Sequence, residues 1–392
     1  MTRKMWLASG SALALTTVGL TGAAPPSPPI ANYWVSASTE SGMGSGMGNG
    51  MGSGGPAGMA AMMTGGGSPS RTLRLQLGSR QPGAALDVGD HQPPAGLGVG
   101  ASLPLRGSLK ASAMPGEFQR PSGRMLVYWG CGEHVGPGQP LVIDFAKMAA
   151  GQMPPGWGAM VAGAMPPQPR PGRGYGEWPN DRDSRSVPAS GSLVGAHSVR
   201  SPISPPIAFS LNAGQDFMPS LDLGERGSLP SGAARLGWRP APTATGYALS
   251  LMGAAENGGN DMILWSSSRT GGLNSMGLMD YLPPARVRQL IASGQVLSPA
   301  TSECVLPAEV ARVAPSGFVR MIGFGPEFDF ADAPRAPKWV AKVRFKTSAS
   351  LIRGMDMSDG DGASGGRRGP TAKPKKPSWR DLLKGVVRPP LR

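Results

Sequence analysis

The sequence predicts a mainly β protein: one or two β-sandwich-like units flanked by long disordered N- and C-terminal segments. Three observations indicate this class. The chain has 60 Gly and 42 Pro among 392 residues, and both residue types interrupt helices. Short apolar runs of strand-like composition recur between turn residues. The two ends are instead rich in Gly, Pro, Ser and charged residues, a composition that buries too little apolar surface to fold alone.

Residues 1–24 have the layout of a secretory signal peptide. Two basic residues precede an apolar run over 6–20, and small residues follow it. The run is too short, and too rich in Gly, Ser and Thr, to span a membrane well. We expect cleavage after Ala23 or after Ala24, with an uncleaved anchor as the alternative. Either outcome directs the chain to the periplasm, the cell envelope or the extracellular space.

Residues 25–70 follow as a Gly-, Met- and Pro-rich segment that we predict to be a disordered linker. Gly stands at nearly every second position of its central part, which makes ordering costly in backbone entropy. Met43, Met47 and Met51 repeat at a spacing of four. Their thioethers could capture Cu(I), but no His or Cys in the segment completes such a site. A flexible spacer is the favoured interpretation.

Residues 71–148 are predicted to be an N-terminal β-rich region. Leu73, Leu75 and Leu77 alternate with polar residues, as in a half-buried strand. Two further runs, 124–130 and 141–145, have the composition of buried strands. The sequence then turns Pro- and Gly-rich over 149–191, which we expect to be a connector between folded units.

Residues 192–353 are predicted to be a second β unit interrupted by one helix. The helix covers 283–293: two Pro open it, Val287, Leu290 and Ile291 fall on one face, and Gly294 can cap its end. Short strands at regular spacing favour a β-sandwich. We expect these strands at 193–199, 207–211, 234–238, 247–252, 262–266, 318–324 and 339–345.

One segment of this unit resembles a known family. Residues 234–251, ARLGWRPAPTATGYALSL, resemble the B–C hairpin of fibronectin type III domains, in which an apolar-x-Trp strand, a Pro-containing turn and a Tyr that opens the next strand follow one another. The resemblance covers about 205–347. It implies a fibronectin type III-like sandwich in which Trp238 and Tyr247 share one core, with the helix as an insert.

The whole chain is also similar to uncharacterised exported proteins of Gram-negative bacteria. The shared runs are YWGCGEH at 128–134 and YGEWPN at 175–180. This resemblance implies export and supplies no activity, ligand or site.

The two cysteines, Cys131 and Cys304, predict a disulfide, because a small even number of Cys in an oxidising compartment is typical of a bridge. The alternative is a thiol-dependent enzyme with Cys131 as nucleophile and His134 as base. A zinc site would need these residues and His197 in one place. We favour the bridge and predict no catalytic residue, no metal and no cofactor. The acidic runs at 180–184 and 356–362 are interpreted as solvated loops. The second, placed in the EF-hand frame, lacks the two carboxylates that the frame needs.

The net charge of +14 gathers at the C-terminus, where residues 367–392 hold nine Lys or Arg against one Asp. The rest of the chain is close to neutral, so we predict no nucleic-acid partner. Residues 354–392 read as a disordered basic tail that carries a short amphipathic helix at 378–387. Its apolar stripe predicts a docking element for an envelope protein, an anionic membrane surface or the body of the chain itself. The stripe comprises Trp379, Leu382, Leu383, Val386 and Val387.

Overall fold

A computed structural model describes residues 28–42, 68–83, 87–107, 123–153, 165–255, 260–271 and 278–354. The predicted signal peptide, the Met-rich part of the linker, the acidic run at 356–362 and the tail helix lie outside these residues. Within them the fold is mainly β, as predicted. No helix in the described part is long and apolar enough to cross a membrane.

Strands are the commonest regular structure in the described residues. Their bounds are β1 Ala31–Gly42, β2 Ser70–Ser79, β3 Asp87–Gln92, β4 Leu103–Arg106, β5 Arg124–Trp129, β6 Leu141–Asp144, β7 Tyr175–Trp178, β8 Gly195–Arg200, β9 Ile207–Leu211, β10 Gly224–Ser228, β11 Ala234–Gly237, β12 Gly246–Ala254, β13 Met262–Ser266, β14 Glu303–Leu306, β15 Gly317–Ala331 and β16 Trp339–Arg353. The helices are α2 Phe145–Ala149, α3 Pro284–Ala292 and α4 Ala308–Val313, with a short 3₁₀ turn at Ala95–Leu97.

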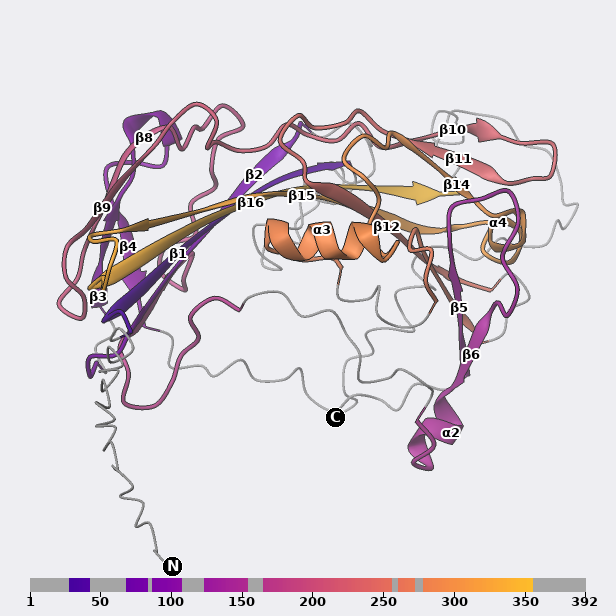
Figure 1. Cartoon of the computed structure of the whole chain (residues 1–392), viewed down its shortest axis with the longest axis horizontal. Coiled ribbons are helices and arrows are strands. Elements are labelled where there is room, and N and C mark those ends of the chain that lie inside the picture. The colour runs from indigo at the N-terminus through magenta and orange to yellow at the C-terminus, as the bar shows by residue number, and fades with distance from the viewer. Residues whose placement is uncertain are drawn as a thin grey trace, which may run out of the picture.

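One long sheet organises the molecule. Its strand order is β6-β5-β13-β12-β15-β16-β1-β2-β7-β4-β3-β8-β9, and it runs from one side of Figure 1 to the other. A smaller sheet has the order β10-β11-β14. The predicted N-terminal region 71–148 is therefore not a unit of its own: β2, β3 and β4 lie on one side of β1, and β5 and β6 lie at the far end beside β13.

Two expectations about unstructured segments are wrong. The linker predicted over 25–70 contains β1, which lies at the centre of the long sheet between β16 and β2. The connector predicted over 149–191 contributes β7, which pairs with both β2 and β4. In each case pairing partners on both sides supply backbone hydrogen bonds that the Gly- and Pro-rich surroundings do not reveal.

The sequence of β1 gives its two faces different chemistry. Tyr33, Val35 and Ala37 point into the main hydrophobic core and are buried. Trp34 and Ser36, one position out of phase, lie on the opposite, polar face, because side chains alternate along a strand. The parallel pairing with β16 continues both faces, since Val35 is opposite Val343 and Ser36 is opposite Arg344.

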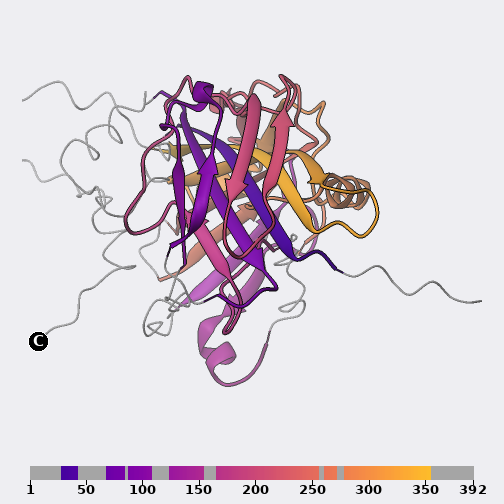
Figure 2. The ribbon, with the colours of Figure 1, turned by 90° about the vertical axis from the view of Figure 1, so that its left-hand side faces the viewer.

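The end of the long sheet that carries β8 and β9 curls back on itself. Phe209 of β9 stacks on Phe330 of β15, with ring centroids 5.1 Å apart, although these strands are far apart in the strand order. Figure 2 shows this end, with β8 and β9 in front of the indigo β1. The curl encloses the buried side chains of β1, β3 and β8 in one core.

The small sheet packs on the other half of the molecule (Figure 1). Leu236 of β11 and Leu306 of β14 belong to the same core cluster as Leu249 of β12. Trp238 and Tyr247 meet edge to face at 5.6 Å between ring centroids, as the resemblance implies. The two flanking strands do not form a hairpin, because β11 pairs with β10 and β14 and β12 pairs with β13 and β15.

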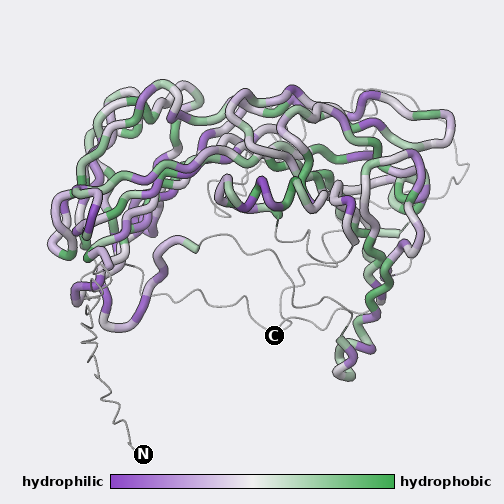
Figure 3. The backbone as a smooth tube through the Cα atoms, in the orientation of Figure 1, coloured by the Kyte–Doolittle hydropathy of each residue, from purple (hydrophilic) through white to green (hydrophobic). Residues whose placement is uncertain are grey.

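The predicted helix is confirmed as α3. Pro284 stands in its first turn, where a missing N–H is tolerated, and Gly294 follows its end with φ +78°, a conformation that favours Gly. Val287 and Leu290 are buried in a separate cluster with Ala248 of β12 and Ile322 of β15. The helix therefore covers one face of the long sheet. Figure 3 shows a second apolar region in green along β5 and β6.

Candidate functional site

The predicted disulfide is confirmed. Cys131, in the loop after β5, is bonded to Cys304 of β14, with Cα atoms 5.2 Å apart. The backbone runs alongside the bridge, because the Gly132 N–H donates to the Val305 carbonyl at 2.9 Å. The bridge thus fastens the edge of the long sheet to the small sheet. In this state Cys131 has no thiol, so the nucleophile of the alternative thiol enzyme is absent.

His134, the base in that alternative, points to a different partner. Its Nδ1 lies 2.9 Å from Glu309 Oε1 of α4, and the His134 side chain is 65% exposed. The second carboxylate oxygen of Glu309 accepts a hydrogen bond from the Val135 N–H at 3.1 Å. Glu309 therefore anchors the Cys131 loop to α4. Sequence reasoning missed this contact because 175 residues separate the two side chains.

The other two histidines are buried together, far from both cysteines in the strand order. His91 Nε2 lies 3.2 Å from His197 Nδ1, and Tyr33 Oη lies 3.0 Å from His91 Nδ1. At the other end His197 Nε2 lies 2.7 Å from the Leu193 carbonyl oxygen. This arrangement excludes His197 from a zinc site with the cysteines, and no metal-binding group of His, Cys, Asp and Glu occurs among the described residues.

The partners fix the direction of every hydrogen bond in this chain. The Leu193 carbonyl only accepts, so His197 Nε2 carries a hydrogen and its Nδ1, in the neutral ring, accepts. His91 must then donate from Nε2 and accept at Nδ1 from the Tyr33 hydroxyl. When both rings are neutral, each ring nitrogen of His91 and His197 and the Tyr33 hydroxyl has a hydrogen-bond partner. Burial lowers the pKa of His91, helped by the nearby His197, and burial also lowers the pKa of His197.

A second cluster lies on the polar face of the long sheet, and we call it the cationic aromatic cluster. It comprises Trp34, Tyr281, Lys342, Arg344 and Lys346. The Arg344 guanidinium carbon lies 4.7 Å from the Trp34 ring centroid and 4.2 Å from that of Tyr281. The Lys346 ammonium lies 4.4 Å from the Tyr281 ring centroid. Such contacts attract a cation to the negative face of a ring.

The two lysines of this cluster differ in electrostatics although both alternate with core residues of β16. Lys346 is paired with Asp280 at 3.1 Å, and burial still lowers its pKa. Lys342 pairs with Glu327 at 3.3 Å and Asp329 at 2.9 Å. Burial opposes protonation there too, but the hydrogen bond to Asp329 and the two negative charges raise the pKa of Lys342 overall.

The cationic aromatic cluster fastens the segment before α3 to the sheet. Tyr281 and Asp280 come from that segment, while the three cations come from β16. The alternation of Lys342, Arg344 and Lys346 with apolar residues is visible in the sequence, but their aromatic partners are distant along the chain. Arg344 is only 5% exposed, and its Nε donates to the Ser36 hydroxyl at 2.7 Å. The contacts described make the cluster a structural element of this face.

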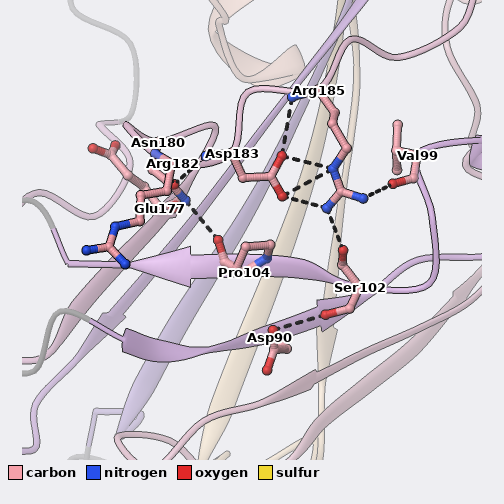
Figure 4. A network of polar contacts seen from close by, with 9 residues as sticks. All are labelled: Asp90, Val99, Ser102, Pro104, Glu177, Asn180, Arg182, Asp183 and Arg185. Carbon is pink, nitrogen blue, oxygen red and sulfur yellow. Dashed lines mark hydrogen bonds and ion pairs between the residues drawn. The ribbon is translucent and has the colours of Figure 1, made fainter.

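The acidic loop at 180–184 is likewise engaged within the protein (Figure 4). Asp183 pairs with Arg185, whose guanidinium also donates to the Val99 and Ser102 carbonyls at 2.6 and 2.8 Å. The Asn180 side-chain amide donates to the Pro104 carbonyl at 2.8 Å. These bonds bind the loop after β7 to the strand β4 and the segment before it. The Asp183 carboxylate thus serves an internal ion pair.

Comparison with known proteins adds no assignment: no protein-family model and no curated protein sequence matches the chain.

Proposed function

We propose that the protein is an exported, non-catalytic protein of the cell envelope that binds or scaffolds through its β body and a C-terminal docking helix. The observation that carries this proposal is the Cys131–Cys304 disulfide. Bridges of this kind persist in oxidising compartments and are rare where thiols are kept reduced. The signal-peptide layout of residues 1–24 supports the same compartment.

We further propose that the body has a fibronectin type III-like sandwich formed by the seven strands β10 to β16. Its support is the strand order. In sandwiches of this class the first, second and fifth strands share one sheet, and the third, sixth and seventh share the other. Here β10, β11 and β14 pair with one another, and β12, β15 and β16 are neighbours in the long sheet. Helix α3 lies in the connection before the fifth of these strands.

The tail would give this body a second point of attachment. Residues 378–387 form the predicted docking helix, and a helix of that length is marginal alone in water. Its partner in the envelope would be another protein or an anionic membrane surface, to which each neighbouring Lys contributes about 1 kcal/mol. Nucleic acid is not among the proposed partners, because the excess of positive charge is concentrated in the tail and the body is close to neutral.

The experiment is to express the full chain, with and without residues 2–24, in a Gram-negative host and analyse each fraction by mass spectrometry without reduction. We expect the full chain in the periplasm or envelope, processed after Ala23 or Ala24, with the Cys131–Cys304 peptide pair bridged. The variant without residues 2–24 should stay in the cytoplasm with both thiols alkylated. Retention of the full chain in the cytoplasm would reject the proposal.

A further inference from the structure

An apolar row crosses the long sheet on the face that carries α3. Each neighbour in the row is a register partner of the next: Ile352 with Phe318, Phe318 with Met252, Met252 with Leu264, and Leu264 with Val127 on the neighbouring parallel strand. The row thus joins β16, β15, β12, β13 and β5 through side chains that share one face of the sheet. We call it the apolar row.

One half of the apolar row is open. Val127 is only 4% exposed and belongs to the cluster formed with β6. In contrast, Met252 is 53% exposed and Phe318 is 39% exposed. Leu264 and Ile352 flank them and are half-buried. Large apolar side chains that are adjacent and exposed at the centre of a row mark a surface that another element can cover.

The space beside α3 suits one more helix. Ala248 lies under α3 and is four residues before Met252 on the same strand, so about 13 Å separate the two positions along β12. Helices that pack side by side have axes 8–10 Å apart. A second helix that lies over Met252 and Phe318 would therefore be a direct neighbour of α3 on the same sheet face.

We propose that the occupant of this open half is the chain's own tail helix, residues 378–387. This inference rests on the docking helix of the proposed function and names where that helix lies when no envelope partner holds it. The stripe of one aromatic and four aliphatic residues matches the chemistry of the apolar row. In this position the tail keeps its basic residues away from the row, because Arg380 and Lys384 fall off the stripe.

The tether between body and tail makes this contact reachable. The chain leaves β16 at Arg353, the residue after Ile352, which is itself part of the row. Ser378 lies 24 residues after Gly354, and the segment between them is rich in Gly, Ser and charged residues. A Gly- and Ser-rich tether of this length spans about 27 Å on average. Phe318 and Met252 lie one and two strand spacings from Ile352, about 5 and about 10 Å away. The local concentration of the tail would then be of millimolar order, which offsets the marginal stability of a short helix.

The test is the rate of methionine oxidation in the full mature chain, followed peptide by peptide during dilute peroxide treatment. Met165 and Met153 are exposed internal references outside the row. We expect Met252 to oxidise several-fold more slowly than Met165, because access governs the reaction. The stripe variant Trp379→Ser/Leu383→Ser should raise the Met252 rate several-fold and leave both references unchanged. The matched control Arg380→Gln/Lys384→Gln, off the stripe, should keep Met252 protected, and so should high salt.

Equal Met252 rates in the wild type, the stripe variant and the control would overturn the inference. Protection that grows over about a hundredfold range of protein concentration would assign the row to a second copy and also reject it. Protection that needs phosphatidylglycerol vesicles, and disappears in high salt, would assign the helix to a membrane instead. That last result would leave the proposed envelope function intact, whereas a cytoplasmic, unprocessed chain would reject the function whatever the oxidation rates.

Discussion

The two ends of the long sheet are held by different chemistry. At one end a covalent bridge joins the loop after β5 to β14; we call this the disulfide end. At the other a chain of neutral side chains links β1, β3 and β8 through Tyr33, His91 and His197; we call this the histidine end. The first arrangement is insensitive to protons and depends on redox conditions. The second is insensitive to reductant and depends on both imidazoles remaining uncharged. The stability of one sheet can therefore depend on redox conditions at one end and on pH at the other.

The largest expected effect is at the disulfide end. The double variant Cys131→Ser/Cys304→Ser opens a loop of 173 residues, and chain entropy then predicts a loss of about 4–5 kcal/mol of unfolding free energy. Urea denaturation followed by tryptophan fluorescence measures the loss. Reduction of the wild type should reproduce it. A variant as stable as the wild type would mean that the bridge adds no constraint to the unfolded chain.

The next effect is a response to acid at the histidine end. Both buried rings have lowered pKa values, whereas unfolded His titrates near pH 6.5. The unfolded state therefore binds more protons below about pH 6.5, and the free energy of unfolding falls as the pH drops through that region. Urea midpoints measured from about pH 8 to pH 5 should decline below about 6.5. A flat profile in the wild type would refute the neutral-ring assignment.

A smaller effect is expected from Tyr33→Phe. The substitution keeps the ring in the core but removes the donor to His91 Nδ1, which leaves a buried acceptor without a partner at a cost of about 1–3 kcal/mol. The same denaturation measurement applies. Tyr281→Phe on the other face is a suitable comparison, because that ring contacts cations through its face and should lose little.

The smallest effect tests α2, next to the disulfide end. The Asp144 carboxylate accepts hydrogen bonds from the Ala146 and Lys147 N–H groups at 2.9 and 3.2 Å, so it caps the helix. Asp144→Ala should lower local stability by about 1 kcal/mol, visible as faster amide exchange in α2 with an unchanged global urea midpoint. Asp144→Asn retains a side-chain acceptor and should exchange at nearly the wild-type rate.

Local patterns predicted much of the secondary structure, while the pairing of the strands depends on contacts that no short window contains. The alternation of Leu73, Leu75 and Leu77 predicts β2, and the apolar stripe with its two Pro predicts α3. Apolar and polar residues alternate in the β1 segment too, but its core face carries the small Ala37 and the polar Thr39. The segment also stands between Pro- and Gly-rich stretches. Composition therefore indicates a linker there, and only the pairing with β16 reveals a strand.

The site was predictable only where one residue type is rare. Two cysteines leave a single possible bridge within one chain, so Cys131 and Cys304 could be paired from the sequence. The histidine chain could not, because 106 residues separate His91 from His197 and neither stands in a motif. Only half of the cationic aromatic cluster could be predicted from the sequence. Its cations alternate with apolar residues along 342–346, but the aromatic rings that contact them come from β1 and from the segment before α3.

The central position of β1 has a consequence for the protein while it is being synthesised. This strand is made early, yet it pairs along its whole length with β16, and the hydroxyl of Ser41 bonds to a carbonyl 307 residues later. At typical elongation rates about 15–60 s pass between the synthesis of these two residues. Throughout that interval one edge of β1 has no strand beside it, and an unpaired edge invites pairing with other chains. Newly made chains are therefore most open to association with one another before β16 has been synthesised. The yield of folded protein should depend on the concentration of nascent chains more than on the stability of the finished protein.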